Sequence, residues 1–333
     1  MRTQRHETHR DGLIPGHTVQ GRGRGAWTLC LITALLLKPA CTLIGPVPSS
    51  NDRAILFAPA TTFSETSGDG GQITSFNVWG YNHVSDDHGR SNVIFNCVPV
   101  ALENGFWNYS NIRYWIPGMN YDFYAVTPTA AAAELRTSND APWHLTIPSF
   151  DITTQTSDDT GADLRLAVSD CLAFDPGTQP DGPAPVALTF NCLLARISIT
   201  LESDASADAS SSEEWSAEIV GLPRYGTFSS RLYDPRDAAT ASSCWTLAEE
   251  TYTETRVTGL SVFPQVLDGS IALNISGLPT ADRDGDGREG NTAIVRLSTP
   301  TGQWEAGIHY HYTFTVEEDG TLRHGDPETE PIN

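Results

Sequence analysis

Cys41 is the residue whose position points most directly to chemistry. It follows a short apolar stretch, residues 26–37, with Arg22 and Arg24 upstream and Ala40 immediately before it. This order of charged, apolar and small residues is typical of a secretory signal. The apolar stretch is shorter than the ~20 residues that a membrane-spanning helix needs. A cysteine at the cleavage point predicts lipidation of its thiol, and therefore an exported chain tethered to a membrane by a lipid anchor.

The signal departs from the usual lipidation motif in two ways. Lys38 and Pro39 stand where a lipobox commonly has Leu and a small residue, so a plain signal peptide cut near Cys41 is the alternative. Residues 1–21 form a polar extension longer than an ordinary n-region, which indicates a start codon placed too far upstream. We expect residues 1–40 to be the signal peptide and residues 41–53 to be a tether or pro-segment.

Two further patterns resemble metal sites but are incomplete. Asp282, Asp284 and Asp286 have the spacing of a calcium loop, in which a bidentate Glu is expected at the twelfth position. That position is Ala293, so an acidic hairpin turn is the preferred interpretation and weak calcium binding the alternative. His309 and His311 would share one face of a strand, but two ligands do not complete a site and cross-strand packing is expected. The sequence predicts no metal and no cofactor.

Four cysteines follow the predicted signal: Cys97, Cys171, Cys192 and Cys244. An oxidising compartment would allow two disulfides with three connectivities, and buried free thiols are the alternative. The spacing contains no paired-cysteine zinc motif.

Composition excludes several function classes. Without positions 1–40 the chain has 14 basic and 39 acidic residues, a net charge near −25, which repels phosphate backbones and disfavours nucleic-acid binding. Lys38 is the only lysine, so phosphate-loop, Schiff-base and Ser-x-x-Lys chemistry are excluded from the mature chain. Carboxylates are abundant, but nothing singles out a glycosidase pair. We therefore expect a protein that is not an enzyme.

The mature chain reads as β-structure almost throughout. Turn residues recur about every ten positions, and the runs between them alternate with a period of two, which favours antiparallel sandwiches. Only residues 130–135 favour a helix. The last ten residues have no strand pattern and are expected to be mobile. The predicted strands lie at residues 76–81, 121–126, 164–168, 186–190, 196–201, 270–275, 293–297 and 310–316.

A proline-rich segment, residues 175–185, marks the best domain boundary, because four prolines in eleven positions cannot continue a strand. The expected organisation is therefore an N-terminal β-sandwich over residues 54–174, the linker, and a C-terminal β-sandwich over residues 186–333.

Short aromatic and apolar motifs occur along the mature chain in a fixed order. They are Ile55-Leu56-Phe57, Phe76-x-Val78-x-Gly80-Tyr81, Trp107-x-Tyr109, Tyr121-x-Phe123-x-Ala125, Leu164-x-Leu166-Ala167, Leu188-x-Phe190, Gly226-Thr227-Phe228, Phe263-Pro264-Gln265 and the closing Trp304-x-Ala306-Gly307-x-x-Tyr310-x-Tyr312. In this order they resemble the fimbrillin-like family of exported fimbrial lipoproteins from Bacteroidota, and the closing motif carries the most weight.

The resemblance implies two transthyretin-like sandwiches in tandem and assembly with other fimbrial subunits by β-strand addition. It also implies proteolytic trimming after an arginine, for which Arg53 is the matching position. Residues 326–333 lack the alternating apolar strand of a polymerising subunit, which favours a tip or anchor subunit, or a non-polymerising surface lipoprotein. Adhesion to host or bacterial surface ligands through loops is also expected. The alternative is a surface lipoprotein that binds glycans on exposed tryptophans.

Overall fold

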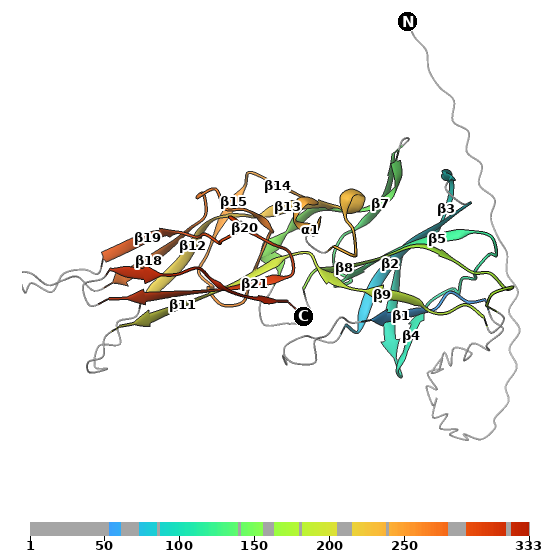
Figure 1. The fold of residues 1–333 in the computed structure, drawn as a ribbon, viewed down its shortest axis with the longest axis horizontal. Helices are drawn as coiled ribbons and strands as arrows, with labels where there is room; N and C mark the ends of the chain where they lie inside the picture. The colour runs from blue at the N-terminus through green and yellow to red at the C-terminus, as the bar shows by residue number, and fades with distance from the viewer. Residues whose placement is uncertain are drawn as a thin grey trace, which may run out of the picture. The chain divides into compact units, whose positions relative to one another are not determined.

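The computed structural model describes residues 53–60, 73–84, 87–138, 141–155, 163–179, 182–204, 215–237, 240–278, 291–317 and 321–332. These residues belong to one compact unit, residues 45–333. They form an all-β structure of several mostly antiparallel sheets (Figure 1), so the predicted fold class is confirmed. Helical structure in this part is limited to single turns, and none of it could cross a membrane. The turns are α1 (Thr240–Ser243), η1 (Ile152–Thr154) and η2 (Ser230–Leu232).

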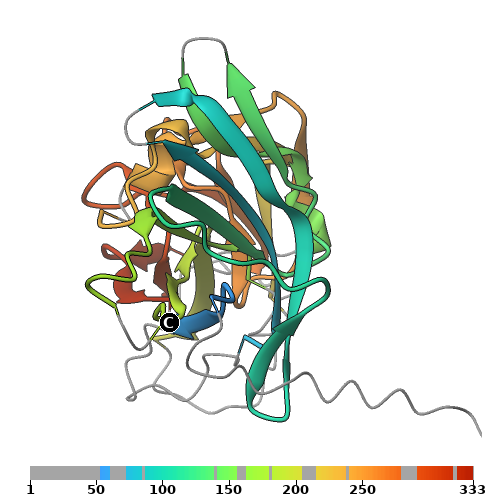
Figure 2. The same cartoon turned by 90° about the vertical axis from the view of Figure 1, so that its right-hand side faces the viewer.

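A six-stranded sheet is the centre of the N-terminal part of the chain. Its cyan and green strands lie closest to the viewer in Figure 2. In order across the sheet they are β10 (Asn191–Cys192), β8 (Arg165–Ala173), β5 (Asn120–Thr127), β2 (Ser75–Val84), β3 (Asp87–Glu103) and β4 (Phe106–Tyr109).

Both faces of this sheet are covered, so its central strands are buried throughout instead of alternating. Along β5, Tyr121, Phe123 and Ala125 enter one core cluster, while Tyr124 and Val126 enter another. Gly80 on β2 faces Phe123 so closely that an added Cβ would lie 2.8 Å from the Phe123 ring. This contact explains why the motif Gly80-Tyr81 has a glycine within a strand.

One face is covered by β1 (Phe57–Ala60) and β9 (Val186–Thr189), which pair in parallel. Parallel neighbours need a long connection, and here it is the whole chain between them. This pair unites residues from both sides of the proline-rich segment 175–185. The division of the chain into two sandwiches at that segment remains a prediction.

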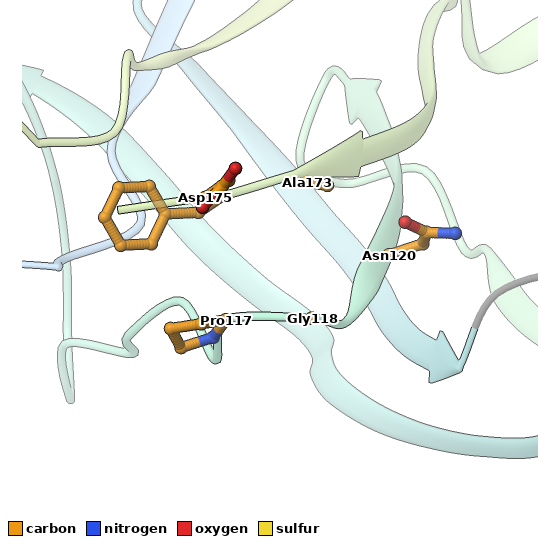
Figure 3. A pocket seen from close by; sticks show the side chains of 6 residues that line it. Pro117, Gly118, Asn120, Ala173 and Asp175 are labelled. Carbon is orange, nitrogen blue, oxygen red and sulfur yellow. The ribbon is translucent and has the colours of Figure 1, made fainter. Parts of the chain in front are cut away.

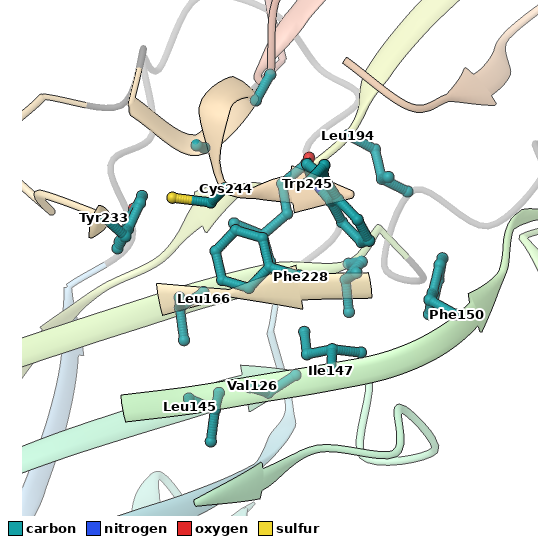
Figure 4. Packing of buried hydrophobic residues seen from close by; sticks show 14 of the residues in the cluster. Val126, Leu145, Ile147, Phe150, Leu166, Leu194, Phe228, Tyr233, Cys244 and Trp245 are labelled. Carbon is teal, nitrogen blue, oxygen red and sulfur yellow. The ribbon is translucent and has the colours of Figure 1, made fainter. Parts of the chain in front are cut away.

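The other face is covered by a four-stranded sheet. Phe228 and Trp245 of this sheet lie in one core cluster with Val126 and Leu166 of the six-stranded sheet (Figure 4), and the Phe228 and Trp245 ring centroids are 5.4 Å apart. The strands are β14 (Trp245–Leu247), β13 (Tyr225–Ser229), β7 (Ala141–Asp151) and β6 (Glu134–Ser138). The helix predicted at residues 130–135 is wrong, because β6 begins at Glu134; six residues are too few to sustain a helix without tertiary support.

The third core cluster lies between two sheets of the C-terminal part. The first consists of β16 (Leu260–Val262), β11 (Ala195–Ser203), β21 (Ile308–Val316), β22 (Leu322–His324) and β23 (Glu328–Pro331). The second consists of β15 (Thr251–Glu254), β12 (Ser216–Pro223), β18 (Ala272–Leu278) and β19 (Asn291–Arg296). A separate pair joins β17 (Gln265–Val266) to β20 (Gln303–Trp304).

Two details of the first of these sheets differ from the sequence prediction. β11 and β21 run parallel, in register from Arg196 and His309 onward. The last ten residues, predicted to lack strand structure, contain β23, which pairs with β21; β22, just before them, also pairs with β21. Main-chain pairing needs no apolar side chains, so an edge strand of polar residues leaves no hydrophobic pattern.

Candidate functional site

The predicted trimming residue, Arg53, lies at the beginning of a segment held by main-chain pairing. Its side chain is exposed, while its carbonyl oxygen accepts a hydrogen bond from the Trp115 N–H at 2.7 Å. Ala54 and Tyr114 form an antiparallel bridge. The Ile55 N–H donates to the Arg113 carbonyl at 2.8 Å. We call residues 53–57 and 112–116 together the N-terminal pairing site.

Apolar side chains anchor this segment to the core. Ile55 and Phe57 are 0% and 5% exposed. Phe57 packs against four aromatic rings with centroid separations between 5.5 and 6.1 Å, those of Phe76, Phe95, Tyr109 and Phe123. Burial of this kind contributes roughly 1.5–3 kcal/mol for each side chain, so release of the segment is costly.

Tyr109 connects the two strands of the N-terminal pairing site. Its hydroxyl donates to the Ile55 carbonyl at 2.6 Å and accepts from the Arg113 N–H at 3.2 Å. Burial raises the pKa of Tyr109, so the hydroxyl keeps its proton and remains a donor. Arg113 fixes the loop in turn: its guanidinium lies 4.5 Å from the Phe95 ring centroid and donates to the Asn111 carbonyl at 2.8 Å.

The outer side of the same loop is apolar. Ile112, Tyr114 and Ile116 are exposed and alternate with Arg113 and the buried Trp115. The loop therefore exposes one apolar face to water. Such a face is a feature of surfaces that bind other proteins.

A shallow pocket of about 350 Å³ begins where this loop ends (Figure 3). Pro117, Gly118 and Asn120 lie on one side, and Ala173, Phe174 and Asp175 on the other. The Asp175 carboxylate accepts from the Gly177 N–H at 2.8 Å, so it stabilises the turn that opens the proline-rich segment. The pocket has no set of converging acid, base and nucleophile.

The remaining sequence-predicted residues are placed as follows. Cys41, Asp282, Asp284 and Asp286 lie outside the described residues, as does the side chain of Cys171. Cys97, Cys192 and Cys244 are free thiols. Cys192 is buried, and burial raises its pKa to about 12, which makes it unreactive as a nucleophile. Sequence reasoning could not identify the exposed face of the loop, because its apolar residues follow the same alternation as core strands.

The tryptophans do not form an exposed platform in the part of the chain that the structure describes. Trp79, Trp115, Trp245 and Trp304 are buried, and the other described tryptophans are partly buried. The described surface therefore lacks the exposed indoles on which the glycan-binding alternative depends.

The comparison with protein families agrees with the motifs. The family model described as fimbrillin-like matches residues 66–331. The chain belongs to the fimbrillin-like family. Members of this family are structural or adhesion proteins, so the chain is a fimbrial or adhesion protein, and a location in a fimbrium at the cell surface follows from the family.

Solved structures support the same fold at low sequence identity. A candidate cell adhesion protein from Bacteroides uniformis has 18% identity and a TM-score of 0.54, with 85% of this fimbrillin-like chain and 100% of that chain covered. A fimbrial protein from Bacteroides vulgatus has 13% identity and a TM-score of 0.51, with the same coverage. No curated protein matches this chain.

Proposed function

We propose that this fimbrillin-like chain is a non-enzymatic fimbrial subunit or accessory protein that is first anchored to the outer membrane through Cys41 and that assembles by β-strand addition after trimming at Arg53 has removed this anchor. The observation that carries the proposal is that the side chain and the carbonyl of Arg53 have different environments. Its side chain is exposed to a protease, and its carbonyl is the partner of the Trp115 N–H.

Trimming would have a direct consequence for the N-terminal pairing site. Cleavage after Arg53 removes the carbonyl that satisfies the Trp115 N–H, while Ala54 to Phe57 remain anchored in the core. An unpaired donor beside the apolar face of Ile112, Tyr114 and Ile116 is the kind of edge to which a neighbouring strand adds.

The trimming test uses Arg53→Ala in the native cell, with Arg231→Ala, also an exposed arginine, as the matched control. The Arg53 side chain makes no contact that the pairing needs, because only its carbonyl is used, so the variant keeps the fold. We expect assembled material from the wild type and from Arg231→Ala to begin at Ala54 on N-terminal sequencing. Arg53→Ala should give no oligomer ladder on unheated gels. Assembly of Arg53→Ala at the wild-type level, or a different N-terminus, would contradict the proposal.

The anchor is tested separately with Cys41→Ser. Because trimming after Arg53 removes residue 41, the test uses the untrimmed Arg53→Ala chain, which should partition into the detergent phase and carry a diacylglycerol on its N-terminal peptide by mass spectrometry. Cys41→Ser in the same background should lose both properties. Unchanged partitioning of Cys41→Ser would remove the lipid anchor from the proposal without affecting strand addition.

A further inference from the structure

Three side chains that can bind a metal gather on the outward face of the five-stranded sheet. His309 and His311 alternate with the buried Tyr310 and Tyr312 along β21, and Glu330 lies directly opposite His309 on β23. The Glu330 Oε1 atom is 3.3 Å from Nδ1 of His309 and 3.0 Å from Nε2 of His311. All three donor atoms lie within 4.8 Å of one another.

These distances between donor atoms suit the tetrahedral coordination of a metal ion. Two ligands bonded at 2.0–2.1 Å with a tetrahedral angle between them lie about 3.4 Å apart. Both donor separations that involve Glu330 are within a few tenths of an ångström of this value. The ligand nitrogens of the two imidazoles lie within 4.8 Å of each other, so they need to move only a short distance closer. His311 and Glu330 can provide this movement because their side chains are 39% and 58% exposed.

The more buried histidine is already oriented by a neighbouring strand. Nε2 of His309 is 2.9 Å from the Ser198 hydroxyl on β11, and the same hydroxyl accepts from the Gly259 N–H at 2.9 Å. A hydroxyl oxygen has a second lone pair for the His309 Nε2–H. That tautomer directs the free lone pair of Nδ1 toward Glu330, as an outer hydrogen bond does for a metal-binding histidine.

The charges around the group also favour a cation. The Arg196 guanidinium is engaged by the Asp163 carboxylate, with N–O distances of 2.7 and 2.8 Å. The chain as a whole has a net charge of −21.

We propose that His309, His311 and Glu330 bind a divalent transition-metal ion of the zinc type, and that the ion fastens the C-terminal strand β23 to β21. Two imidazoles and one carboxylate suit zinc, cobalt and nickel, and disfavour calcium and magnesium, which prefer oxygen ligands. Three protein ligands leave the fourth position for water. This site is independent of trimming at Arg53, so either proposal can fail without the other.

The first test measures binding to the full-length chain, purified without a histidine tag. Cobalt titration should produce the absorption bands of a tetrahedral site, and zinc should displace the cobalt. Glu330→Gln and His311→Gln should weaken binding by at least about 100-fold, since even partners outside the coordination shell are worth 10–100-fold. His324→Ala and Glu328→Gln, a histidine and a carboxylate on the same edge but outside the group, should change affinity by less than about threefold. Excess calcium should not displace cobalt.

Two results would overturn the proposal: the absence of tetrahedral cobalt bands, or wild-type affinity in both Glu330→Gln and His311→Gln. Glu330 is exposed and His311 is only partly buried, so the variants should keep the fold, and urea denaturation of each variant distinguishes a lost site from unfolding.

The second test measures whether the ion fastens β23. With free zinc at 100 times Kd, any opening that separates Glu330 from the histidines is suppressed about 100-fold. Amide hydrogen exchange in a peptide covering residues 322–333 should slow accordingly in the wild type and in Glu328→Gln, and stay unchanged in Glu330→Gln. Exchange that is insensitive to zinc in the wild type would refute the fastening role.

Discussion

The two ends of the described chain are both paired through the main chain but differ in the side chains that hold them. Residues 53–57 insert the buried Ile55 and Phe57 into an aromatic core. β23 contributes four residues that are all exposed, so it is held by main-chain pairing with β21 and by the contacts of Glu330 with His309 and His311. One attachment is hydrophobic and insensitive to salts and metals, and the other is polar.

This difference separates two kinds of control. An end anchored by buried side chains is released only when a covalent bond is cut or the core opens, which fits regulation by proteolysis. An end anchored by exposed polar groups exchanges readily and responds to ions in its surroundings. The comparison predicts that substitutions at the N-terminal segment affect global stability, whereas substitutions on β23 affect local stability.

The largest expected effect is that of Phe57→Ala. Loss of a ring packed on four others should lower the free energy of unfolding by about 3–5 kcal/mol. Urea denaturation measures this change, with Thr329→Ala on β23 as the control, which should change stability by less than about 1 kcal/mol. Similar losses in the two variants would show that the ends do not differ as described.

Apolar strands could be predicted from the sequence, whereas polar and proline-containing strands could not, and the reasons are physical. Strands with apolar residues at alternate positions were located correctly, among them β2, β5, β11 and β21. The long strand β3 has a polar beginning and Pro99 within it, and β7 contains Pro142 and Pro148, so both were missed. β23, with the sequence Glu-Thr-Glu-Pro, lies at an exposed edge.

The candidate sites at Arg53 and at His309, His311 and Glu330 could also be predicted only in part from the sequence. Arg53 came from the family resemblance, as the matching position just before Ile55, and its trimming stays a prediction. The structure adds that its carbonyl accepts from the Trp115 N–H, a residue distant in sequence. His309 and His311 were visible as a pair because they are two residues apart. Glu330 was not, since only the register of β21 with β23 brings it opposite His309. Periodicity identifies the face of a strand but not its neighbours.

A smaller effect is expected from Tyr109→Phe, which keeps the ring and removes the hydroxyl between Ile55 and Arg113. The buried Ile55 carbonyl would lose its partner, so stability should fall by about 1–2 kcal/mol. Amide exchange at residues 53–57 should accelerate, while exchange at β23 should not. Tyr114→Phe, which changes an exposed hydroxyl in the same loop, is the control. Equal acceleration at both ends would mean that they open as one cooperative unit.

The smallest effect is expected from Glu330→Gln without metal. Glu330 is 58% exposed, and its contacts with His309 and His311 are therefore screened by water. Exposed ion pairs contribute about 0–1 kcal/mol, so urea denaturation with a chelator present should barely distinguish this variant from the wild type, and added salt should remove the remaining difference. Glu328→Gln is again the control. A loss above about 2 kcal/mol specific to Glu330→Gln would show that the polar cluster stabilises the fold as a core does. In that case β23 would already be stably paired with β21 without metal, and binding of an ion would add little to the stability of this strand.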